Sequence, residues 1–131
     1  MFTEEYFGGN GQGEGLDNKK KGGCVKDGPF AKWRPHYPVP DCLRRRFDSG
    51  NCIAAFHSPE AIQELITTND SFSAFAQYME GSSHGRVHNG VGGGMCSMYS
   101  TNDPIFFLHH AMIDRIWWQW QKARSGHAKS C

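Results

Sequence analysis

The chain lacks any marked excess of charge, with 14 Lys and Arg against 13 Asp and Glu and a net charge of +1. Balanced charge gives no electrostatic reason to expect a nucleic-acid or membrane partner. The chain also lacks an apolar run long enough to cross a bilayer, because the longest, around Ile105 to Trp120, is broken by histidines and charged residues. Its first residues lack the basic and then apolar pattern of a secretory signal peptide, so we expect none in this chain.

The cysteines lack the close Cys-x-x-Cys spacing of a zinc knuckle, which argues against that class of structural zinc site. Five cysteines are nevertheless many for 131 residues, and they are Cys24, Cys42, Cys52, Cys96 and Cys131. Disulfides in an oxidising compartment fit this number better, although an odd count leaves one thiol over.

A length of 131 residues suits one domain. We expect residues 1–56 to form a loop-rich region with at most short strands, because glycine and proline punctuate the stretch. Within it, the basic run "LRRRF", Leu43 to Phe47, is predicted to be a solvated loop. The alternative is that one of its arginines pairs with a buried carboxylate.

Residues 57–124 are predicted to be helical. Ser58 is a good N-cap for a helix that starts at Pro59, and Pro is favoured at the first helical position. A second helix is expected from about Phe72 to Met79, since apolar residues recur there at helical spacing. We expect Gly81 to Ser83 to interrupt it, with a short helix restarting at Ser83 and ending at Gly92 to Gly94.

The last helix is the clearest, with Asn102 or Asp103 as its cap and an end near Lys122. It is apolar nearly all round, and a helix of that kind is usually buried. A buried helix that carries His109 and His110 calls for an explanation.

His84 and His88 are four residues apart, so on a helix they lie on one face and can direct both imidazoles at one point. A metal site is one interpretation, and two surface histidines on a short polar helix is the other. Zinc proteases with this spacing place a glutamate directly after the first histidine, but Gly85 stands there, so the general base of zinc hydrolysis is missing. Neutral imidazole ligands suit zinc, copper, iron and nickel.

A third ligand is expected from the last helix. His109 and His110 point about 100° apart, so they cannot both face one ion. Asp114 lies one turn beyond His110, and metal-binding histidines are usually oriented by a carboxylate or carbonyl. We therefore predict that His110 is the ligand and Asp114 its polar support, and that His109 is a core histidine bonded to the backbone.

Three motifs together resemble the second copper-binding half of the tyrosinase family, the type 3 copper proteins that include tyrosinases, catechol oxidases and hemocyanins. They are "HGRVH", "GGGM" and "STNDPIFFLHHAMIDRIWWQWQ". Upstream, "EYFGGNGQGEG" and "CVKDGPFAKW" resemble the linker between the two copper halves, so the resemblance covers nearly the whole chain. It implies a mainly α fold, the half of a four-helix bundle that holds the copper called CuB, with a long loop-rich N-terminal segment.

By this resemblance, His84, His88 and His110 are the three ligands of one copper, with one copper expected per chain and two in a complete site. The half that holds the other copper lies upstream in the family, and we expect this chain to begin after it. The remaining histidines, His36, His57 and His127, are expected on the surface or in loops. A second copy of the chain, or a separate chain carrying the missing half, is therefore an expected partner.

The resemblance also suggests finer roles. Glu80 matches an acid that holds a water near CuB in many members, although an exposed glutamate at a helix end is an equal alternative. Members that hydroxylate monophenols often carry asparagine where this chain has Gly85, while Asn89, after His88, is polar and available. Catechol oxidation is therefore favoured over phenol hydroxylation. Cys24 and Cys42 are candidates for a disulfide around the linker.

The expected function is oxidation of phenols or catechols to o-quinones with O2. The first alternative is a copper-binding or interaction protein without catalysis that needs a partner chain. An oxygen carrier is a further alternative, but hemocyanins shield the site with an extra domain that is not visible here. Family and cysteine content favour a secreted or lumenal protein.

Overall fold

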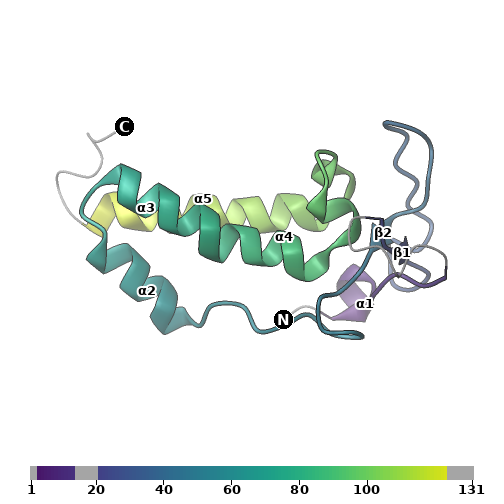
Figure 1. The fold of residues 1–131 in the computed structure, drawn as a ribbon, viewed down its shortest axis with the longest axis horizontal. Helices are drawn as coiled ribbons and strands as arrows, with labels where there is room; N and C mark the ends of the chain where they lie inside the picture. Colours follow the sequence, from purple (N-terminus) through teal and green to yellow (C-terminus); the bar gives the residue numbers. More distant parts are fainter. Residues whose placement is uncertain (1–2, 14–20, 124–131) are drawn as a thin grey trace. The chain divides into compact units, whose positions relative to one another are not determined.

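The computed structural model describes residues 3–13 and 21–123, so His127 and Cys131 lie outside the described residues. The described chain is mainly helical (Figure 1). Its elements in order are α1 Glu4–Phe7, β1 Gly23–Cys24, β2 Arg44–Arg45, α2 Pro59–Thr68, α3 Phe72–Met79, a π-helical turn Glu80–His84, α4 Gly85–Val91, 3₁₀ turns Gly93–Cys96 and Ser100–Asn102, and α5 Ile105–Ala123. The described residues divide into two compact units, the first within residues 1–54 and 88–107 and the second within residues 55–87 and 108–131.

The first unit contains a small antiparallel sheet in which β1 pairs with β2, with Gly23 opposite Arg45. A disulfide joins Cys24 to Cys42, whose Cα atoms are 5.6 Å apart, so the pairing suggested by the resemblance is confirmed. The predicted loop-rich character also holds here, because the two strands contain only two residues each. The short helix α1 was not expected.

A buried ion pair organises this unit. The Nε and Nη2 atoms of Arg45 donate to the two carboxylate oxygens of Asp103 at 2.8 and 2.9 Å, and both side chains are fully buried. The Nη1 atom of Arg45 also donates to the carbonyl oxygens of Phe7 and Gly8. The prediction of a solvated loop is therefore wrong at Arg45, and the alternative of a pair with a buried carboxylate is confirmed. Planar guanidinium groups favour such bidentate pairing in buried sites.

Asp103 has a second role, because its Oδ1 accepts a hydrogen bond from the backbone N–H of Ile105 at the start of α5. Of the two candidate caps, the structure therefore selects Asp103. The amide of Asn102 instead donates to the carbonyl oxygen of Tyr37. One carboxylate thus satisfies both a buried arginine and a helix N-terminus, which needs such an acceptor.

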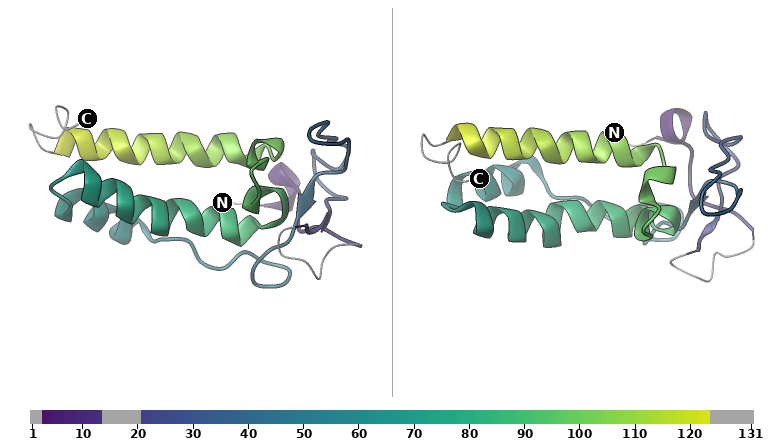
Figure 2. Two further views of the ribbon diagram at one scale, coloured as in Figure 1. Left: turned by 45° about the horizontal axis from the view of Figure 1, so that its top comes forward. Right: turned by 90° about the horizontal axis from the view of Figure 1, so that it is seen from above.

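The second unit has its own apolar core, to which α2, α3 and α5 all contribute. The backbones of these helices are drawn in Figure 2. Its buried members are Leu65, Ile66, Phe75, Ile116 and Trp120. The rings of Phe75 and Trp120 stack with centroids 4.7 Å apart, and the Trp120 indole N–H donates to the carbonyl oxygen of Asn69. Ser58 caps α2 as predicted, since its hydroxyl accepts from the N–H of Ala61.

The predicted interruption at Gly81 to Ser83 is wrong, because the backbone stays helical from Phe72 to Val91. After α3 the chain makes one π-helical turn, in which the N–H of Gly85 donates to the carbonyl oxygen of Glu80, five residues back. A π turn takes up one extra residue without ending the helix. The helix ends instead at Gly92, whose positive φ of 64° suits glycine.

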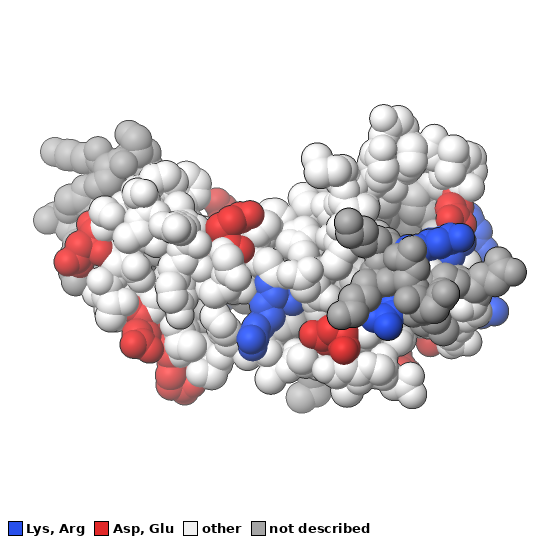
Figure 3. Space-filling view, in the orientation of Figure 1, with Lys and Arg blue, Asp and Glu red and all other residues white. Residues whose placement is uncertain are grey.

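Helix α5, although apolar nearly all round, is buried on one side only. Ile116 and Trp120 are buried, but Leu108, Met112 and Trp118 are 55%, 51% and 52% exposed. No helix among residues 3–13 and 21–123 is both long and apolar enough to span a bilayer. On the face drawn in Figure 3, acidic and basic side chains form small separate groups in a surface that is otherwise uncharged.

Candidate metal centre

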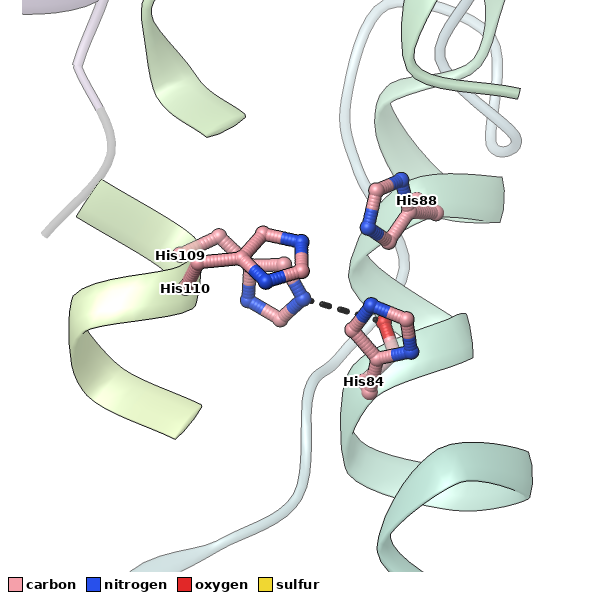
Figure 4. A group of neighbouring side chains, drawn as sticks. All are labelled: His84, His88, His109 and His110. Carbon is pink, nitrogen blue, oxygen red and sulfur yellow. Dashed lines mark hydrogen bonds between the residues drawn. The ribbon is translucent and has the colours of Figure 1, made fainter. Parts of the chain in front are cut away.

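Four imidazoles converge on one point, those of His84, His88, His109 and His110. One ring nitrogen from each lies within 4.8 Å of those of the others. His84 closes the π-helical turn, His88 follows one helical turn later in α4, and the other two come from α5 (Figure 4). The cluster thus joins the pair spaced by four residues to the adjacent pair in the last helix.

His84 lies at the centre of the ring contacts. Its ring stacks on that of His109 with centroids 5.3 Å apart and meets the ring of His110 edge-on at 5.0 Å. Its Nδ1 atom is 3.0 Å from Oε2 of Glu80, one turn earlier in the helix. The Glu80 side chain is 75% exposed, so it approaches the ring from the solvent side.

His88 is held by the backbone of the glycine-rich turn that follows its helix. Its Nδ1 atom is 2.7 Å from the carbonyl oxygen of Met95. Because a carbonyl only accepts, Nδ1 carries the proton and Nε2 keeps the lone pair that a metal ion needs. The turn requires glycine, since a Cβ on Gly93 would collide with the carbonyl group of Arg44. The "GGGM" motif therefore serves the orientation of His88.

His109 is nearly buried, and its Nε2 atom lies 3.1 Å from the carbonyl oxygen of His84 (Figure 4). The prediction that His109 is a core histidine bonded to the backbone is confirmed. The proton that it donates sits on Nε2, so this nitrogen is committed to the backbone.

The donor set fits a copper ion. The described side chains that form the cluster are all imidazoles, and neutral imidazole suits copper and zinc better than magnesium or calcium. Nδ1 of His88 is bonded to the carbonyl oxygen of Met95, an arrangement that normally orients metal-binding histidines. Nδ1 of His84 lies 3.0 Å from a carboxylate oxygen of Glu80, but this contact does not have the geometry of a hydrogen bond. The cluster is thus consistent with half of a copper site.

Two other residues singled out in the sequence lie outside this cluster. Asp114 is exposed on α5, and among the described residues no hydrogen bond joins it to His110. The amide oxygen of Asn89 is 3.6 Å from the sulfur of Cys96. His36 is exposed as expected, whereas His57 is half-buried with Nδ1 3.0 Å from the hydroxyl oxygen of Ser83, a contact without any spacing signal in the sequence.

A cluster made only of histidine side chains from helices is the kind of site that defines one class of metalloprotein, the class that binds copper or zinc through imidazole. Residues 1–123 match the tyrosinase family in the region described as the common central domain of tyrosinase, so the chain belongs to that family. It is 36% identical over 124 residues to the tyrosinase ustQ of Aspergillus flavus, covering 88% of this chain and 34% of that protein.

Two further relatives extend this picture. The chain is 30% identical over 142 residues to a tyrosinase of Streptomyces antibioticus, covering 93% of this chain and 48% of the relative. It is also 30% identical over 135 residues to the N-acetyl-6-hydroxytryptophan oxidase ivoB of Emericella nidulans, covering 79% of this chain and 36% of the relative. The chain therefore spans about a third to a half of the length of the relatives that it matches.

Proposed function

We propose that this chain forms the CuB half of a type 3 copper centre, with His84, His88 and His110 as the ligands of one copper ion. The convergence of the four imidazole nitrogens within 4.8 Å carries this proposal. His110 is preferred to His109 as the third ligand because the resemblance to the tyrosinase family assigns it that role, and the bond from Nε2 of His109 to the carbonyl oxygen of His84 supports this choice by leaving only Nδ1 of that ring for a metal ion.

The proposed reaction is oxidation of a phenol or catechol by O2. Two catechols and one O2 give two o-quinones and two waters, so each catechol loses two electrons and two protons. Copper in a complete site of two ions would relay these electrons between the catechol and O2. The role proposed for this chain is to hold the three imidazoles in a fixed geometry. His109 contributes by bonding to the backbone carbonyl oxygen of His84.

Glu80 is proposed to orient His84 through the contact at its Nδ1 and to accept a hydrogen bond from a water near the metal. Asn89 is proposed as a second polar group beside His88, and Asp114 as a polar support below His110. Gly85 offers no side chain to assist deprotonation of a monophenol, so catechol oxidation is proposed over phenol hydroxylation.

A complete centre would need three further histidine ligands, and we propose that a second copy of the chain or a chain carrying the other copper half supplies them. A copper-binding protein without catalysis is the second candidate function. Its support is that His36 is exposed and His57 contacts Ser83, so these two described histidines do not extend the cluster. The disulfide between Cys24 and Cys42 supports a secreted or lumenal location.

The test loads the full chain with copper and measures metal content, the electron paramagnetic resonance spectrum and quinone formation from a catechol. We expect one copper per chain with nitrogen hyperfine coupling that is lost in His110→Ala. Quinone formation would support the oxidase. Bound copper without turnover, also after addition of a chain with the other copper half, would favour the second candidate, and no bound copper would refute both.

A further inference from the structure

The second unit contains an open pocket of about 530 Å³, whose described lining includes His109 but not the proposed ligands His84, His88 and His110. Helix α2, the segment before it, the π-helical turn and α5 all contribute to its walls. Most of the lining is apolar, including Phe56, Ile62, Ile66, Ile113 and Ile116. A volume of this size lies within the range of about 300–1,000 Å³ that is typical of small-molecule sites.

Among the described residues that line this pocket, Arg115 is the only formally charged one. Its side chain is exposed on α5, and among the described residues no carboxylate forms an ion pair with it. A single cation beside an apolar cavity complements one negative charge attached to an apolar body. A doubly charged group such as a phosphate would require more positive charge than the pocket offers.

The polar groups deeper in the pocket are already engaged with one another or with the backbone. Nδ1 of His57 lies 3.0 Å from the hydroxyl oxygen of Ser83, which is itself only 7% exposed. His109, which also lines the pocket, is bonded through Nε2 to the carbonyl oxygen of His84. The deep part is therefore suited to an apolar group, and the charged group of a ligand belongs at the Arg115 side.

We infer that this pocket binds an amphipathic monocarboxylate, with its hydrocarbon chain against the isoleucines of α2 and α5 and its carboxylate paired with Arg115. This site is separate from the proposed copper ligands, and the inference does not rest on the proposed function. The carboxylate would accept hydrogen bonds from the guanidinium, whose planar geometry matches it.

The test uses octanoate and octan-1-ol as probes on the full chain, with binding measured by isothermal titration calorimetry. The two molecules share a hydrocarbon body and differ in charge. We expect octanoate to bind with one site per chain and octanol more weakly. Arg115→Gln should weaken octanoate about fivefold, the size of one solvent-exposed ion pair, and leave octanol within twofold. Lys122→Gln removes a cation of the same helix that does not line the pocket, so it should change neither.

A second variant tests the cavity itself. Ile113→Trp places a larger ring in the pocket and should abolish binding of both probes while the copper content remains as in the parent chain. Equal effects of Arg115→Gln and Lys122→Gln would overturn the assignment of the carboxylate. Octanoate binding that persists in Ile113→Trp would overturn the assignment of this pocket as the ligand site. Failure of both probes to bind the parent chain would also overturn it, and would favour a groove that is covered by another part of a protein.

Discussion

The Nε2 atom of His109 lies 3.1 Å from the carbonyl oxygen of His84, so the side chain of one histidine fixes the backbone of another. His110, the next residue along α5, meets the ring of His84 edge-on instead. The two adjacent histidines thus make different contacts with His84, although a ring nitrogen of each belongs to the same cluster. His109 ties α5 to the helix that carries His84, whereas His110 contacts the ring of His84.

This division predicts unequal effects of two alanine variants on copper binding. His110→Ala removes a proposed ligand and should weaken copper binding by more than a hundredfold. His109→Ala removes a positioning contact and should weaken it about tenfold, as loss of an orienting partner does. Competition with a chelator of known affinity measures both.

The variant His109→Gln provides the control, since its amide N–H₂ still donates to the carbonyl oxygen of His84. It should recover copper binding to within a few-fold of the parent chain and keep the same nitrogen hyperfine pattern. A larger loss in His109→Gln than in His110→Ala would instead identify His109 as the ligand.

Replacing Arg45 by methionine should destabilise the first unit strongly. The variant leaves the carboxylate of Asp103 buried without its cation, and breaking a buried pair in this way costs about 3–5 kcal/mol. Urea unfolding followed by circular dichroism measures the loss. Arg45→Met combined with Asp103→Asn should recover part of it, and equal stability of the single and double variants would show that the buried charge is not the cause.

Two phenylalanines of α3 test the core of the second unit. Phe75 is fully buried and stacked on Trp120, whereas Phe72 is 38% exposed. Phe75→Ala should lower the free energy of unfolding by about 3–5 kcal/mol, the usual cost of emptying a buried aromatic site. Phe72→Ala, the matched control, should cost well under half as much in the same urea titration. Similar losses would mean that the aromatic contacts of Phe72 with Trp117 and Trp120 matter as much as the stacked pair.

The Asp41 carboxyl predicts that the stability of the folded chain depends on pH in the acid range. A hydrogen bond from the Arg44 side chain lowers the pKa of the Asp41 carboxyl, with help from the N–H of Cys42 and against the opposing effect of partial burial. A lowered pKa means that the folded chain favours the carboxylate, so the stabilisation is present above the ordinary carboxyl pKa near pH 4 and is lost as the pH falls through the lowered value.

The Asp41 side chain is 45% exposed, so solvent screening limits the contribution to under about 1 kcal/mol. Comparing the unfolding free energies of the parent chain and Asp41→Asn from pH 6 to pH 2 measures it. The difference should shrink toward zero at the acid end, and a constant difference would assign the effect to hydrogen bonding rather than to charge.

Much of the helical part was predictable because its signals are local. Ser58 and Pro59 mark a helix start through their own chemistry, and Asp103 does the same for α5. The backbone bond of His109 was also predicted, but the premise that adjacent helical histidines cannot face one point was wrong, since ring nitrogens of both His109 and His110 lie in the same cluster. The tyrosinase family was suggested by the resemblance of the motifs "HGRVH", "GGGM" and "STNDPIFFLHHAMIDRIWWQWQ", and it agrees with the match over residues 1–123.

Other features depend on partners that are distant in the sequence. Of the three consecutive arginines, Arg45 is the one that pairs with Asp103, which is 58 residues away in the sequence. No local sequence pattern identifies Arg45 as the paired residue. The carbonyl oxygen of Met95 that holds His88 is a backbone group, so its residue type gives no indication of the role. The prediction of a helix break at Gly81 was wrong for a different reason. Glycine weakens a helix, but it does not determine whether the helix ends there or continues through a wider π-helical turn.

The π-helical turn at Glu80–His84 changes the direction in which His84 and His88 point around the helix axis. It does so without changing the direction of the core residues of α3. In a uniform α-helix, His84 would stand nine residues after Phe75 and so about half a turn round the axis from it. The extra residue in the π turn rotates the segment after it backward by about 100°, which brings the imidazoles toward the side that packs on α5. Insertions or deletions between residues 80 and 84 would therefore change the direction of the proposed metal ligands while the packing of α3 stayed intact.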